Sequence, residues 1–251
     1  MNVIALFLLV SRVISIKVFS FEPSSSALST VQLKDSPKTS LPERFIFCFA
    51  MKQDKIDGRS PLLLRDKDNQ PWLALGMWNQ GNQLALWAEI GRKDWKMFHW
   101  VEVAWKFWTH ICADVDTAAG NIAVSLDGRP IITKSSEKLR TGKPDNLDQG
   151  LVIGISDSDV TNGGRRQFDG SFSNLNFYVQ DGSESIEELA KYPCRQEGNY
   201  HPWSKMIFER NGNRIIESER NKREVCAVLP DLHKVLLPGK MYFIFSTISF
   251  F

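Results

Sequence analysis

The stretch Trp108-Thr109-His110-Ile111-Cys112, followed by Asn121-Ile122-Ala123-Val124-Ser125-Leu126 and then Asp127-Gly128, decides the fold. Apolar residues alternate with smaller or polar ones in 121–126, which predicts a strand with one buried face and one solvent-exposed face. Residues 116–120 join the first two strands, and Asp127-Gly128 supplies the positive φ angles of a tight hairpin turn. The pattern predicts two antiparallel strands and the start of a third, with a cysteine in the first.

Strand patterns continue on both sides of this hairpin, separated by turn residues. Short strands at such spacing favour an all-β sandwich or jelly roll of two antiparallel sheets. The segment 24–42 is rich in Ser and Pro, but Val31 and Leu33 alternate with polar residues and predict an edge strand. The further predicted strands are 45–49, 72–78, 84–87, 150–155 and 172–178.

One short helix is predicted just before Pro193. Ser185 and Glu188 form a capping box, and the apolar stripe Ile186, Leu189 and Ala190 follows it.

Composition excludes some classes of partner. The chain has 251 residues, 31 Lys and Arg and 29 Asp and Glu, giving a net charge of +2. A charge so close to balance does not point to nucleic acid or to acidic lipid.

Both ends of the chain are apolar. Residues 3–10 are too short to span a bilayer and have the length of a signal-peptide core, so we predict a secretory signal over 1–17. The alternative is a buried first strand. The tail within 231–251 fits neither a membrane span nor a lipid-anchor signal, and we interpret it as a truncated or mis-predicted terminus.

The four cysteines are Cys48, Cys112, Cys194 and Cys226. They contain no C-x-x-C pair, which argues against a zinc site, and a secreted chain favours disulfides. The residues alone leave all three pairings open. A bridge between the last two would close a small, loop-rich C-terminal extension over 193–230.

The chain resembles the pentraxins, and more broadly the laminin-G-like and concanavalin-A-like sandwiches, over 18–192. The residues that carry the resemblance are Phe45–Phe49, Arg65–Asn69, His110–Cys112 with Asp127–Pro130, Val152–Gly154 and Gly170–Asn176. The resemblance implies a jelly roll and a Cys48–Cys112 bridge, which leaves Cys194–Cys226. We expect the first bridge to pin the two facing sheets together.

The resemblance also implies a calcium site on loops, because pentraxins hold Ca²⁺ through carboxylates and amides and the ion then binds ligand. The candidate metal ligands are Asp68, Asn69, Asp157 and Asp159. Gln167 is a further candidate at the ligand site. Arg165 and Arg166 could instead neutralise the acids or bind an anionic ligand directly.

Seven tryptophans lie between Trp72 and Trp108. Because Trp72 and Trp78 share one face of a strand, as do Phe98 and Trp100, we expect core packing, with Trp95 as an exposed candidate for ligand binding. We expect His110 to make a buried hydrogen bond without a catalytic role.

The sequence favours a secreted or extracellular recognition domain that binds carbohydrate or phosphorylated ligands. The alternative is a protein-binding adhesion or receptor module without calcium. A cyclic homo-oligomer would raise weak single-site affinity. Glycoside hydrolysis is disfavoured, because Asp114-Val115-Asp116 lacks a third acid on its strand.

Overall fold

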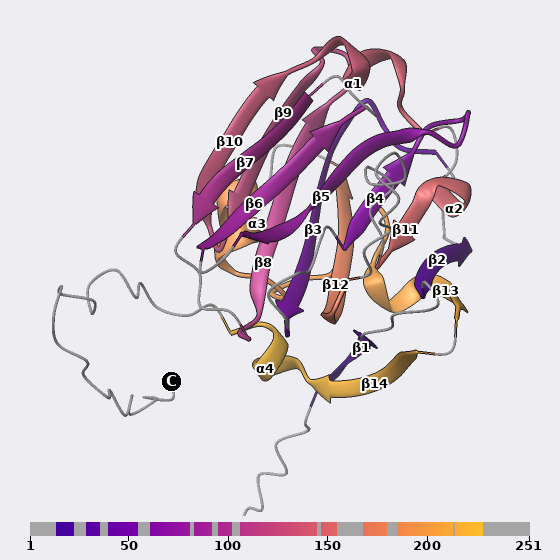
Figure 1. The fold of residues 1–251 in the computed structure, drawn as a ribbon, viewed down its shortest axis with the longest axis vertical. Helices are drawn as coiled ribbons and strands as arrows, with labels where there is room; N and C mark the ends of the chain where they lie inside the picture. The colour runs from indigo at the N-terminus through magenta and orange to yellow at the C-terminus, as the bar shows by residue number, and fades with distance from the viewer. Residues whose placement is uncertain are drawn as a thin grey trace, which may run out of the picture.

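The computed structural model describes residues 14–22, 29–35, 40–54, 61–80, 83–91, 95–101, 106–144, 147–154, 168–179, 185–212 and 214–227. Within these residues the strands form two antiparallel sheets of seven strands each, and Figure 1 shows them stacked as two layers. Sheet A has the order β10 (Arg129–Ser135), β9 (Asn121–Leu126), β8 (Thr109–Asp116), β3 (Arg44–Gln53), β12 (Gly170–Val179), β1 (Ser15–Phe21) and β14 (Ile215–Asn221). Sheet B has the order β13 (Ile207–Asn211), β2 (Thr30–Asp35), β11 (Leu151–Ile153), β4 (Leu62–Arg65), β5 (Pro71–Gln80), β6 (Gln83–Ile90) and β7 (Trp95–Val101). The predicted sandwich is confirmed.

The core between the sheets is built from alternate residues of each strand. On β3, Phe45, Phe47 and Phe49 are almost fully buried, and neighbouring rings stack at centroid distances of 6.2 and 6.4 Å. Phe172 and Phe177 of β12 pack against the same row. This period of two follows from the strand pleat, which sends successive side chains to opposite faces.

The outer face of β3 is apolar for a different reason. Ile46 and Cys48 form a second buried cluster with Ile186, Leu189 and Ala190 of α3 (Ile186–Lys191). The helix prediction is confirmed, and the Ser185 hydroxyl accepts a hydrogen bond from the Glu188 N–H as the capping box requires. The continuous apolar run in β3 therefore reflects one sheet and one helix packing on opposite faces.

The predicted hairpin is confirmed. Asp127 and Gly128 have φ angles of 47° and 79°, and they connect β9 to β10. The Asp127 carboxylate accepts a hydrogen bond from the His110 N–H at 2.8 Å, and the Asp127 N–H donates to the His110 carbonyl at 2.8 Å. The turn is thereby fixed to β8.

Both implied disulfide pairings are present, but the expected role of the first is wrong. Cys48 and Cys112 are directly opposite each other on the neighbouring strands β3 and β8 of sheet A, with Cα atoms 4.1 Å apart. Facing sheets lie about 10 Å apart, beyond the usual Cα separation of a disulfide. The bridge therefore staples two strands of one sheet. Cys194–Cys226 has a Cα separation of 5.8 Å.

The segment closed by Cys194–Cys226 adds a strand to each sheet. β14 pairs with β1 and β13 pairs with β2. The expectation of a loop-rich extension is therefore wrong, and so is the edge position of the Val31–Leu33 strand, because β13 covers the edge of β2. Sequence patterns missed β13 and β14 because they carry mostly polar, exposed side chains.

A buried asparagine holds this segment to the sandwich. Asn176 of β12 is fully buried, and its side-chain oxygen accepts from the N–H groups of Gly198 at 3.0 Å and Trp203 at 2.9 Å. Its amide donates to the side-chain oxygen of Asn174 at 2.9 Å.

The first strand overlaps the predicted signal peptide. Ser15, Ile16 and Lys17 pair with β14, and Ile16 is buried. The Trp203 indole donates to the Lys17 carbonyl at 3.1 Å. A signal that ended at residue 17 would include these three residues of β1, so the signal over 1–17 stays a prediction.

The short helices are α1 (Glu137–Thr141), α2 (Leu147–Gly150), α3 and α4 (Lys222–Val225), with a 3₁₀ turn at Trp203–Lys205. In the part of the chain that is described, no helix has the length and apolar character needed to cross a membrane.

Candidate ligand-binding face

Two segments that carry polar residues, 55–60 and 155–167, leave and rejoin the sandwich at one place. The Asp54 N–H donates to the Asp169 carbonyl at 3.1 Å, and the Gly154 N–H donates to the Pro61 carbonyl at 2.7 Å. The Phe168 N–H donates to the Gly154 carbonyl at 3.0 Å. The four residues that flank the two segments are thus tied together, and we call these contacts the loop base.

The loop base is rigidly packed. Gly154 has φ +100°, and a Cβ atom there would lie 2.3 Å from Cε1 of Phe21. Phe21 packs edge-on against Phe168 at 5.5 Å between ring centroids. Glycine is needed at position 154 because both the backbone angle and the neighbouring ring exclude a side chain.

Of the candidate metal ligands, Asp68 and Asn69 lie in the exposed turn between β4 and β5. The Asn69 side-chain oxygen accepts from the Arg65 guanidinium at 3.0 Å, and the Asp68 N–H donates to the Asp66 carboxylate at 2.9 Å. Asn69 has φ 59°, which asparagine tolerates in turns. These contacts make the turn a self-contained structural unit.

The sheet register separates this turn from the loop base. β4 pairs with β11 so that Leu64 is opposite Leu151 and Leu62 is opposite Ile153. Residues 66–70 follow the Arg65 end of β4, whereas Gly154 lies beside Pro61 at the other end. Antiparallel pairing thus places the turn with Asp68 and Asn69 at the opposite end of β4 from Gly154. The assignment of Asp68 and Asn69 as metal ligands stays a prediction.

The other candidates are not placed by the structure. Asp157, Asp159, Arg165, Arg166 and Gln167 lie outside the described residues, and so does the side chain of Trp95, whose backbone pairs with Ile90. Among the described residues, no group of three or more His, Cys, Asp or Glu side chains could hold a metal ion.

Sequence analysis missed two acidic residues at the loop base. Asp54 directly follows β3 and Asp169 directly precedes β12, and their backbones are hydrogen-bonded. The Lys52 ammonium lies 3.7 Å from the Asp54 carboxylate. Their position in the sequence could have identified them, since both acids lie immediately outside strands that were predicted.

His110 and Asp127 have shifted pKa values because they are buried. Burial lowers the pKa of His110 to about 4, although a hydrogen bond with the Val225 backbone opposes this shift. Burial raises the pKa of Asp127 to about 6, opposed by the hydrogen bond from His110 and by Arg129. His110 is 2% exposed. The prediction of a buried, hydrogen-bonded histidine is confirmed.

The expected core position is confirmed for Trp72 but not for Trp100. On β5, Trp72 is 1% exposed and belongs to the main core together with Leu73, Leu75 and Met77. Its indole N–H donates to the Lys138 carbonyl of α1 at 3.0 Å. Trp100 is 47% exposed, so its expected core position is wrong.

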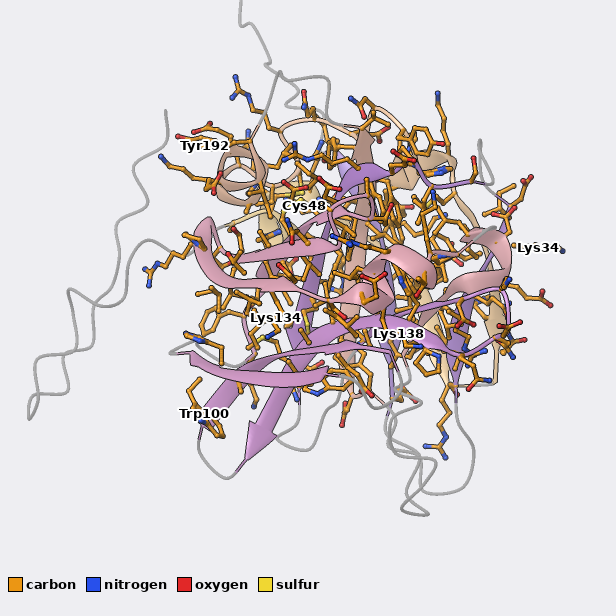
Figure 2. All side chains as sticks on the ribbon, turned by 90° about the horizontal axis from the view of Figure 1, so that it is seen from above. Lys34, Cys48, Trp100, Lys134, Lys138 and Tyr192 are labelled. Atoms are coloured by element: carbon orange, nitrogen blue, oxygen red, sulfur yellow. A yellow bond between two sulfur atoms is a disulfide. The ribbon has the colours of Figure 1, made fainter. Side chains whose placement is uncertain are left out.

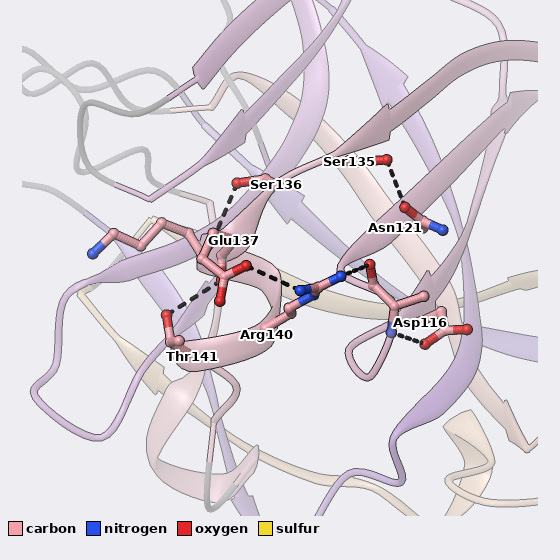
Figure 3. Close-up of polar contacts among 9 residues, drawn as sticks. Asp116, Asn121, Ser135, Ser136, Glu137, Arg140 and Thr141 are labelled. Atoms are coloured by element: carbon pink, nitrogen blue, oxygen red, sulfur yellow. Dashed lines mark hydrogen bonds and ion pairs between the residues drawn. The ribbon is translucent and has the colours of Figure 1, made fainter.

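The acids of Asp114-Val115-Asp116 serve structural contacts. Asp114 lies 3.3 Å from the Arg44 guanidinium. Figure 3 shows Asp116 accepting a hydrogen bond from the Ala119 N–H, at 2.7 Å, in the turn that leads to β9. Arg140 of α1 donates to the Ala119 carbonyl at 3.0 Å and ties α1 to the same turn.

The arrangement of strands, helix and loop base matches a known family. The model of the Pentaxin family matches residues 17–218. The chain belongs to the pentaxin family. The match extends through β13 and into β14.

Solved structures share the pentaxin fold of this chain. The native heptameric SAP-like pentraxin from Limulus polyphemus has 16% identity and a TM-score of 0.63, over 84% of this chain and 97% of that one. A putative carbohydrate-binding protein from Bacteroides ovatus has 13% identity and a TM-score of 0.52, over 81% and 60%. The full extracellular region of zebrafish Gpr126/Adgrg6 has 17% identity and a TM-score of 0.52, over 79% and 27%. No curated protein matches the chain.

Proposed function

We propose that this pentaxin domain is an extracellular recognition domain that binds carbohydrate or phosphorylated ligands through the segments 55–60 and 155–167. The observation that carries the proposal is the loop base, where hydrogen bonds join the ends of both segments. Loops held by a rigid scaffold are the usual location of binding residues. Two disulfides and no free cysteine among the described residues support an oxidising, extracellular environment.

Calcium is the proposed cofactor, with Asp157 and Asp159 as its protein ligands. Their carboxylates have the oxygen chemistry that Ca²⁺ requires. Bound calcium would supply open coordination positions for ligand oxygens. Asp68 and Asn69 are the other two proposed ligands; their turn follows the Arg65 end of β4, so they are tested by a separate variant.

A matched pair of variants tests the calcium site on the full chain. Asp157→Asn with Asp159→Asn should abolish the heat of Ca²⁺ binding in calorimetry and the thermal stabilisation by millimolar calcium. Asp68→Asn tests the turn between β4 and β5 separately: a weaker heat of Ca²⁺ binding would support Asp68 as a ligand, and an unchanged heat would remove it from the proposed set. If the wild-type chain gives no heat and no stabilisation with calcium, the metal proposal is wrong.

Ligand binding is tested separately. The wild-type chain should be retained on phosphocholine or polysaccharide resin and released by a chelator. Retention that survives the chelator and is lost in Arg165→Gln with Arg166→Gln would support direct binding of an anionic group without calcium. Absence of retention under all conditions would favour the alternative of a protein-binding module.

The proposed activity is recognition without catalysis. Hydrolysis of a β-glucan that is lost in Asp114→Asn would contradict it. We also propose that a cyclic homo-oligomer multiplies a weak single-site affinity. Light scattering after size exclusion would measure the number of subunits, and a monomer at working concentration would contradict this part.

A further inference from the structure

We infer a second binding surface, separate from the loop base, at the end of α3. It consists of Tyr192, Lys191 and Arg195, and we call it the Tyr192 cluster. The Lys191 ammonium lies 5.2 Å from the centroid of the Tyr192 ring, and the Arg195 guanidinium carbon lies 5.9 Å from the same centroid. We propose that this cluster binds a sulfated polysaccharide.

The cluster is exposed but firmly held. The Tyr192 side chain is 46% exposed, and Lys191 and Arg195 are exposed as well. The helix beneath is anchored on sheet A through Ile186, Leu189 and Ala190. The Arg195 N–H donates to the Tyr192 carbonyl at 3.1 Å, and Cys194, one of the two residues between them, is bridged to Cys226.

The two positive charges are available to an anion. Neither Lys191 nor Arg195 forms an ion pair among the described residues. The acids of α3, Glu187 and Glu188, precede Lys191 by four and three residues and are its neighbours on the helix, but neither forms an ion pair with it. Arg129 is electrostatically coupled to buried Asp127, so we leave it out of the cluster.

The chemistry of the cluster fits an anionic sugar chain. Because both cations contact one ring, their charges lie within about 11 Å of each other, a span that two anionic groups on neighbouring sugars can match. The contact with the ring restricts two long side chains before binding, which lowers the entropy cost of ordering them. The exposed ring also offers an apolar surface to the C–H face of a sugar.

The cluster lies away from the proposed calcium loops. α3 packs on Ile46 and Cys48, near the Arg44 end of β3, whereas Asp54 of the loop base follows the Gln53 end of the same strand. Figure 2 shows Tyr192 and Lys34 at opposite sides of the molecule, so Lys34 offers a distant control position. Arg210 offers a second exposed control position, because it lies on β13, which pairs with β2 of sheet B.

The test is retention of the full chain on immobilised heparin in the presence of chelator. Lys191→Gln with Arg195→Gln should elute at lower salt. The slope of the logarithm of affinity against the logarithm of salt concentration should also be shallower by about two, about one for each cation removed. Lys34→Gln with Arg210→Gln removes the same charge and should elute with the wild type. Tyr192→Ala should weaken retention, and Tyr192→Phe should restore it.

Three results would overturn the inference. They are equal losses in the cluster and control variants, equal retention on chemically desulfated heparin, and no retention of the wild type. The calcium-dependent binding proposed above should be unchanged in the cluster variant, so the two proposals fail independently.

Discussion

Replacing Asp127 by Asn tests the electrostatic cost of the hairpin turn that defines sheet A. The substitution keeps the side-chain oxygen that accepts the His110 N–H, and it keeps a residue type that adopts φ 47° readily. Asn-Gly is also a favoured sequence for this type of hairpin turn. The main change is the loss of a partly buried negative charge.

The size of the effect follows from the pKa of Asp127. Burial raises it from an ordinary value of 3.8 to about 6, so the folded state binds the proton more tightly than the unfolded chain. The contribution of Asp127 to stability is therefore fully present below pH 3.8 and is lost as the pH rises through 6. The cost of the ionised group relative to low pH is about 3 kcal/mol at pH 8, about 1.5 kcal/mol at pH 5 and about 0.5 kcal/mol at pH 4.

Asp127→Asn should consequently be more stable than the wild type at pH 8. The pKa of about 6 already includes the attraction to Arg129, so the expected gain at pH 8 is about 3 kcal/mol. The gain should shrink steadily towards pH 4. The titration of His110 affects both proteins and cancels in the difference between them.

Urea unfolding of the full chain with its disulfides intact, at pH 8, 5 and 4, measures the difference. Asp68→Asn is the control, because it removes a carboxylate from an exposed turn and should change stability little. A variant that is less stable than the wild type at pH 8, or a gain that does not depend on pH, would refute the explanation based on burial.

Three further substitutions test particular contacts. Asn176→Ala leaves two buried N–H groups without their acceptor and should cost about 2–4 kcal/mol in urea unfolding; a loss under 0.5 kcal/mol would mean that water replaces the amide. Gly154→Ala should destabilise the chain by about 2 kcal/mol or more and weaken calcium binding, because the new methyl meets Phe21; unchanged melting and calcium heat would contradict a rigid loop base. Joint replacement of Cys194 and Cys226 by Ala should cost about 3–4 kcal/mol by the chain-entropy model for a separation of 32 residues, and a change below 1 kcal/mol in thermal unfolding would show that the contacts of this segment suffice without the bridge.

Much of the sandwich could be predicted because its strands carry local signals. The alternation in 121–126 and the Asp127-Gly128 turn specify a strand and a hairpin through side-chain periodicity and φ preference alone. The capping box at Ser185 likewise specifies a helix start. β13 and β14 had no such signal, since their exposed polar residues gain order from pairing with β2 and β1.

The candidate site was only partly accessible to sequence reasoning. Asp68 and Asn69 fitted a family motif in type and order, yet antiparallel pairing of β4 with β11 places their turn away from the loop base. The Tyr192 cluster was missed because its interest depends on two cations meeting one ring in space.

By itself, the order of residues determined which segments are extended and where the chain turns. These features depend on neighbours within a few positions, so periodicity and turn preference are enough to specify them. Only the folded chain decided which strands are adjacent, that Cys48 and Cys112 bridge one sheet, and that Asp54 meets Asp169 while Pro61 and Phe168 meet Gly154. Such contacts join positions up to more than a hundred residues apart, and strand register and side-chain packing select them.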